Sequence, residues 1–210
     1  MKNIRLTVWI GMMCGCLAAG MLQAGTRPDN ARPAEEDGSR LWLPVMRPAE
    51  GAEVEVIYKG KVSPTIAIAI AELKNAWKGE PVLLEKKKTG QGDGFAITSS
   101  EHQVRILSST EAGLLYGVYS LLRMQAAGQV TVPLSATEQP VYDLRILNHW
   151  DNPDGTVERG YAGRSLWNWE ELPGTLSPRY EAYARANASV GINGTVLNNV
   201  NASPQVLATG

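Results

Sequence analysis

An apolar run from Val141 to Leu147 passes directly into Asn148-His-Trp-Asp-Asn-Pro-Asp154, and this change of pattern constrains the fold most. The run is typical of a buried strand, whereas the residues after it are amides, carboxylates and ring side chains. In α/β barrels, strands that end in such groups carry the binding chemistry at their carboxyl ends. We therefore expect residues 148–154 to lie at the edge of a site.

A helix and a second strand follow, in the order of a βαβ unit. Ser177-Pro178 is typical of a helix start, the helix is predicted over Arg179–Val190, and Gly191 ends it. Ile192–Leu197 is the next predicted strand. This unit is the repeating element of a (β/α)₈ barrel, which takes about 250 residues. The chain has 210 residues, so we expect 141–210 to be the truncated start of a barrel domain.

Residues 40–140 predict a separate, small α/β sandwich domain. Its first helix begins at Ser63-Pro64 and carries apolar residues at helical spacing up to Trp77. Its second helix is capped by Thr110 and stops at Gly128. The predicted strands are 53–58, 82–85, 94–98, 104–107 and 130–134, with a hairpin turn over 90–94 and a linker over 135–140.

The N-terminus has the pattern of a signal peptide over residues 1–24, with Lys2 and Arg5 before an apolar stretch. Cys16 offers lipidation as an alternative, but the residues before it fit that motif poorly, so we expect simple cleavage. Residues 25–39 are predicted to be a flexible leader. The mature chain is then secreted or periplasmic, without a membrane span and without a cysteine for a metal site.

Charge and composition exclude few classes of function. The net charge of −1 gives no sign of a nucleic-acid partner, and 44% hydrophobic residues is ordinary for a globular protein. Residues 90–94 are glycine-rich but precede a strand, which does not suit a phosphate loop.

The block Asn148–Ser165, which contains His-Trp-Asp-Asn, Asp-Gly and Val-Glu-Arg-Gly-Tyr-Ala-Gly, closely resembles the start of the catalytic barrel of family 67 glycoside hydrolases, the α-glucuronidases. The segment Arg179–Ala202 extends the resemblance. The match is dense over 142–204 and looser over 37–140, which resembles the family's non-catalytic N-terminal domain.

The resemblance implies an inverting exo-α-glucuronidase that releases D-glucuronic acid, or its 4-O-methyl ether, from xylan-derived glucuronoxylooligosaccharides. Inversion uses two carboxyl groups on opposite faces of the sugar. In the family these come from later barrel strands, so we expect the catalytic residues after Gly210 and no turnover by these 210 residues. The resemblance implies no cofactor or metal, and it allows a homodimer of the full-length enzyme.

Five residues are predicted to bind substrate. The resemblance places Trp150 in the uronic acid pocket, where an indole face suits sugar C–H groups, although a core tryptophan remains an alternative. Arg159 could bind the uronate carboxylate, or pair with Glu158 inside its loop. The others are Asn152 beside Trp150, Asn199, and Val200, which the resemblance places near the O4 substituent; an asparagine-rich turn is the alternative for 198–201.

Strand alternation puts Asn148, Trp150 and Asn152 on one side, and turns His149 towards the helix layer or the rim. For His149 a structural hydrogen bond and a substrate contact both remain open. Trp167 and Trp169 are expected to cap the barrel or to pack on the helix.

Two other functions fit the residues less well. One is a non-catalytic carbohydrate-binding or scaffold protein. The other is a related barrel glycosidase of hexosaminidase-like type, against which the block Asn148–Ser165 argues.

Overall fold

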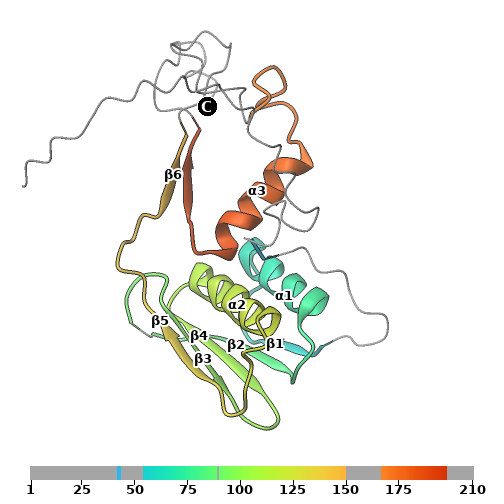
Figure 1. The fold of residues 1–210 in the computed structure, drawn as a ribbon, viewed down its shortest axis with the longest axis vertical. Helices are drawn as coiled ribbons and strands as arrows, with labels where there is room; N and C mark the ends of the chain where they lie inside the picture. The colour runs from blue at the N-terminus through green and yellow to red at the C-terminus, as the bar shows by residue number, and fades with distance from the viewer. Residues whose placement is uncertain (1–41, 44–53, 89, 150–166, 198–210) are drawn as a thin grey trace, which may run out of the picture. The chain divides into compact units, whose positions relative to one another are not determined.

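The computed structural model describes residues 42–43, 54–88, 90–149 and 167–197 (Figure 1). These residues lie in one compact unit, Gly38–Gly210. The elements are β1 (Val56–Tyr58), α1 (Pro64–Ala76), β2 (Val82–Lys86), β3 (Phe95–Ser99), β4 (Val104–Ser108), α2 (Glu111–Ala126), β5 (Ser135–Glu138), β6 (Ile146–Asn148), α3 (Pro178–Ser189) and β7 (Gly194–Val196). The predicted α/β class is confirmed. The predicted signal peptide and leader lie outside the described residues.

The helices begin and end where their local signals predict. Ser63 accepts a hydrogen bond from the Ile66 N–H through its Oγ, and Thr110 does the same for Gly113. Ser177 caps α3 in the same way. Past the ends of α2 and α3, Gly128 (φ 66°) and Gly191 (φ 79°) adopt the left-handed conformation that glycine tolerates best.

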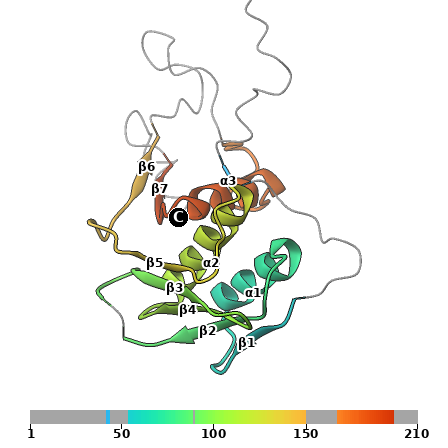
Figure 2. The ribbon, with the colours of Figure 1, turned by 60° about the horizontal axis from the view of Figure 1, so that its bottom comes forward.

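Five strands form a mixed sheet in the order β1-β2-β4-β3-β5. The first three in that order are parallel, whereas β3 runs antiparallel to both of its neighbours. Figure 2 shows α1 and α2 on the same side of this sheet. The result is a two-layer α/β arrangement, with one sheet face buried under the helices.

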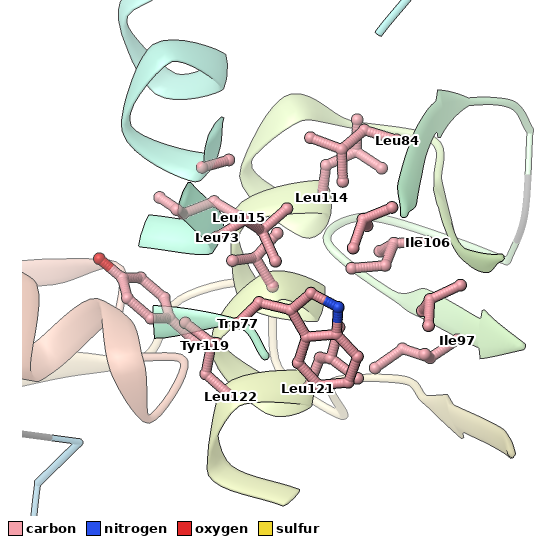
Figure 3. Close-up of a cluster of buried hydrophobic side chains, with 14 of the residues drawn as sticks. Leu73, Trp77, Leu84, Ile97, Ile106, Leu114, Leu115, Tyr119, Leu121 and Leu122 are labelled. Atoms are coloured by element: carbon pink, nitrogen blue, oxygen red, sulfur yellow. The ribbon is translucent and has the colours of Figure 1, made fainter. Parts of the chain in front are cut away.

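The core lies between the sheet and the two helices (Figure 3). Alternate residues of β2, β3 and β4 point into it, α1 contributes Leu73 and is followed by the C-cap residue Trp77, and α2 contributes leucines and Tyr119. Each such side chain contributes about 1.5–3 kcal/mol on burial. The largest members include Leu73, Trp77, Leu84, Ile97, Ile106, Leu114, Tyr119 and Leu121.

Two local predictions in this layer are wrong. Val130–Leu134 is not a strand; the strand is Ser135–Glu138, within the predicted linker 135–140. Pro133 has no N–H for a ladder, whereas β5 pairs along the open edge of β3. The glycines at 90–94 do not form a hairpin, because β2 and β3 are not neighbours; the hairpin is β3–β4.

The second sheet is the parallel pair β6–β7, with α3 between the two strands in sequence. Both strands are shorter than predicted. Val141, Tyr142 and Leu144 precede β6 and are largely exposed, with Val141 at 87%. Within the described ranges, no helix combines the length and the apolar character that a membrane span needs.

Candidate functional site

Two parallel strands bring polar segments to one edge. Asn148 pairs with Val196 in register, and the His149 N–H continues the ladder by donating to the Val196 carbonyl at 3.0 Å. The chain leaves β6 and β7 at the same end, since parallel strands share direction. His149 and Leu197, the last described residues after the two strands, therefore lie at the same end of the pair.

His149 is held on the α3 side of this edge. Its Nε2 lies 2.5 Å from the hydroxyl of Tyr183, and that hydroxyl lies 3.3 Å from Thr195 Oγ1. The imidazole therefore connects the end of β6 to α3 and to β7. Of the two roles left open for His149, the structure shows the structural hydrogen bond, and of the two orientations left open, the helix layer or the rim, it shows the one towards α3.

Trp167 packs on α3. It is only 7% exposed, and its ring centroid lies 5.3 Å from Tyr180 and 5.4 Å from Tyr183, the latter edge-on at 88°. Its Nε1–H donates to the Leu197 carbonyl at 3.1 Å. His149 meets the same indole edge-on, at 5.6 Å and 89°. These rings form an aromatic cluster (His149, Trp167, Tyr180, Tyr183), so packing on the helix, not an exposed cap, is the role shown for Trp167.

A cavity of about 380 Å³ adjoins the aromatic cluster. Its lining is aromatic, aliphatic or uncharged polar, and includes Trp167, Tyr183, Asn187, Asn193, Thr195 and Leu197. Asn187 is 5% exposed, and its buried Oδ1 has no hydrogen-bond donor among the described residues. The described residues of this lining are uncharged, and their polar side-chain groups are amides and hydroxyls.

A second cavity, of about 340 Å³, lies where the two sheets meet. The charged side chains of Arg145 and Asp93 in its lining already form hydrogen bonds. Arg145 Nη2 donates to Asp93 at 3.2 Å, and its Nε donates to the Gly191 carbonyl at 2.6 Å. The same guanidinium lies 5.5 Å from the Tyr116 ring centroid. Burial, followed by the Asp93 charge, raises the pKa of the Tyr116 hydroxyl. These contacts connect β6 to the five-stranded layer.

All five predicted substrate-binding residues lie outside the described residues: Trp150, Asn152, Arg159, Asn199 and Val200. The structure describes their neighbours His149 and Leu197 instead. Across the described ranges, no group of three or more His, Cys, Asp or Glu side chains is placed to hold a metal ion.

Sequence reasoning missed Tyr180, Tyr183 and Thr195. The two tyrosines are three residues apart on a predicted helix, so they share a face, and this spacing was a usable signal. Thr195 carried no comparable signal, because its partner lies on another element.

Comparison with known proteins extends over both described and undescribed residues. Residues 124–210 match the glycosyl hydrolase family 67 middle domain. Over 116 residues the chain is 41% identical to a probable alpha-glucuronidase A of Aspergillus clavatus and 45% identical to one of Neosartorya fischeri. The alpha-glucuronidase A of Aspergillus tubingensis is 40% identical over 115 residues. Each alignment covers 55% of this chain and 14% of the relative.

Among solved structures, a GH138 enzyme targeting pectin rhamnogalacturonan II aligns with a TM-score of 0.40 and 17% identity. That alignment covers 48% of this chain and 17% of the enzyme, and such a likeness supports no conclusion. The sequence relatives favour the α-glucuronidase prediction over the hexosaminidase-like alternative. Over residues 124–210 the chain is therefore similar to the middle domain of glycoside hydrolase family 67, and it spans 14% of the length of the α-glucuronidases that it matches.

Proposed function

We propose that this chain is part of an inverting exo-α-glucuronidase that removes D-glucuronic acid, or its 4-O-methyl ether, from xylan-derived xylooligosaccharides. The observations that carry the proposal are the 40–45% identity to proteins named α-glucuronidase and the match of residues 124–210, which contain both strand ends, to the family 67 middle domain. The activity requires a complete substrate pocket. This chain contributes the first wall of that pocket.

The fold part of the proposal concerns β6, α3 and β7. We infer that they are the first βαβ portion of a (β/α)₈ barrel that begins near residue 141, after a non-catalytic α/β domain over 40–140. Such a portion requires two parallel strands joined by a helix, as in β6, α3 and β7. It also requires polar segments after both strands, at the same edge. Release from the cell by the segment 1–24 completes the proposal.

The residue roles follow the chemistry of a uronic acid. Trp150 offers an aromatic face to the ring, and Arg159 is the cation for the carboxylate. Asn152 and Asn199 supply amides for hydroxyl groups, and Val200 supplies an apolar wall for a methyl ether. None of the described residues that line the cavity beside Trp167 is a cation, so Arg159 is the proposed partner of the carboxylate.

Isothermal titration of the 210-residue chain with D-glucuronic acid tests the binding role. We expect a dissociation constant of roughly 1–10 mM, because a partial pocket supplies about 3–4 kcal/mol. Trp150→Ala and Arg159→Met should each abolish measurable binding. Tyr142→Ala is the matched control, because Tyr142 is 74% exposed and precedes β6. Equal binding by all three variants would contradict the proposal.

Turnover is a separate test. Inversion needs an acid and a base on opposite faces of the sugar, and no pair in this chain is assigned to these roles. We expect no glucuronic acid release when the purified chain is incubated with aldouronic acids and followed by mass spectrometry. Release at a rate above a Trp150→Ala control would show that the catalytic carboxylates lie within these residues.

A further inference from the structure

Helix α3 contacts two different layers through two faces. Tyr180 and Tyr183 contact Trp167 and His149, the other members of the aromatic cluster, at the ends of β6 and β7. Arg185 and Ser189 contact α1 and α2 instead. At 100° per residue, these two pairs lie on nearly opposite sides of the helix. Figure 1 shows α3 beside the strand pair and next to α1 and α2.

The first-layer contact is a buried charged clamp. Arg185 donates from Nε and Nη2 to the two carboxylate oxygens of Glu72, at 2.5 and 2.8 Å. Its Nη1 donates to the Leu43 carbonyl at 2.7 Å, and its guanidinium lies 5.8 Å from the Tyr119 ring centroid. Two parallel bonds in one plane fix orientation as well as distance. The side chains of Arg185 and Glu72 are only 17% and 14% exposed.

The surroundings of the clamp favour the charged pair. The Glu72 hydrogen bonds raise the pKa of Arg185, and burial raises the pKa of the Tyr119 hydroxyl, which donates to Glu72 at 3.3 Å. Arg123 on α2 adds a hydrogen bond to the Ser189 carbonyl in the last turn of α3. The polar sequence of α3 is therefore anchored by charge, with Asn187 and Ser189 as its buried residues.

We propose that Arg185 is a positioning residue: by clamping α3 to Glu72, it sets where Tyr183 holds His149 and therefore where the sugar-binding edge begins. The path runs from Glu72 to Arg185, along two residues of rigid helix to Tyr183, and across a hydrogen bond to His149. Only the sugar-binding part of this proposal rests on the proposed function. The geometric part concerns described residues alone.

The test compares variants of the 210-residue chain by NMR, observing the His149 ring and the Trp167 indole N–H well below the unfolding temperature. Arg185→Gln and Glu72→Gln should shift both signals in the same direction, and Arg185→Lys should shift them less. Arg105→Gln is the matched control, because the Arg105–Glu85 pair is 3.8 Å apart and 50% and 40% exposed. It should leave both signals in place.

A purely structural role gives a different pattern. If Arg185→Gln lowers the unfolding temperature but leaves the His149 and Trp167 signals of the folded protein unchanged, the proposal is overturned. Should Arg185→Gln fail to fold, Glu72→Gln and Arg185→Lys decide the same question. Restoration of both signals by the exchanged pair Glu72→Arg with Arg185→Glu would support positioning.

A ligand arm separates this proposal from the proposed function. With D-glucuronic acid, Arg185→Gln should weaken binding about threefold to tenfold, the usual size of such remote coupling. If the unmodified chain does not bind glucuronic acid, the proposed function fails while the NMR signals still decide the positioning role. If it binds and Arg185→Gln binds equally well, the positioning role fails alone.

Discussion

Tyr183 joins three elements through one hydroxyl group. That group contacts His149 Nε2 after β6 and Thr195 Oγ1 on β7, and the ring belongs to α3. Tyr183→Phe removes both contacts and leaves the partly buried imidazole without this partner. We expect a loss of about 1–2 kcal/mol in the free energy of unfolding, measured by urea denaturation.

Tyr180→Phe is the control for that measurement. The Tyr180 hydroxyl accepts a hydrogen bond from the exposed Asn168 N–H at 2.7 Å, and water can replace it. Its loss should therefore be at most a few tenths of a kcal/mol. Equal losses from both tyrosines would show that the aromatic cluster depends on ring packing alone.

Gly113 is a second residue with a measurable constraint. A Cβ added there would lie 2.1 Å from Ser108 Oγ and 2.9 Å from the backbone oxygen of Asp93. Gly113→Ala should therefore destabilise the fold by about 1–3 kcal/mol despite the higher helix propensity of alanine. Gly174→Ala should be nearly neutral, since its closest contact would be 3.5 Å, and thermal unfolding would compare the two.

At the scale of elements, the caps decide where helices start. Thr110 accepts from Gly113 at 2.9 Å and donates to Asp93 at 3.1 Å. Thr110→Ala should cost about 1 kcal/mol, whereas Thr110→Ser keeps the hydroxyl and should cost a few tenths. Chemical denaturation would measure both. If the serine variant is as unstable as the alanine variant, the methyl group, not the cap, is what matters.

Helices could be predicted from the sequence because their signals are local. Ser63-Pro64 and Ser177-Pro178 specify a start from two adjacent residues, and Gly191 specifies an end. Strand β5 could not, because Ser-Ala-Thr-Glu has no apolar alternation and pairs only because β3 offers a free edge. Each residue of β5 pairs with a residue of β3 that lies 37 to 43 positions earlier, from Thr98↔Ser135 to Phe95↔Glu138, and no local pattern records such a separation.

The site was predictable in the same uneven way. Alternation along β6 limited His149 to the helix layer or the rim, since that depends on one strand alone, and the structure shows it towards the helix. Its partner Tyr183 lies 34 residues further on, and the clamp Arg185–Glu72 spans 113 residues. Such contacts form only when the layers assemble, so no local pattern predicts them.

At the scale of the whole molecule, apolar side chains gather before β6. Val141, Tyr142 and Leu144 are each at least 74% exposed. Patches of this kind promote association. Val141→Lys with Leu144→Lys should lower the apparent mass in static light scattering at high concentration, because added charge opposes contact.

Ile68→Lys is the control for the patch. Ile68 is 49% exposed and lies on α1, whereas residues 141–144 precede β6 and are distant from it in sequence. This variant should leave the apparent mass unchanged. If Ile68→Lys lowers the mass as much as the double variant does, general charge and not the segment before β6 controls association.

The two-sided use of α3 also limits its length. A single residue inserted at Ala184 would turn Arg185 by about 100° relative to Tyr183 and move it about 1.5 Å along the axis. The helix could then satisfy Glu72 or His149, but not both. Related chains that keep both contacts should therefore vary in length before Ser177 and after Gly191, and not between Tyr180 and Ser189.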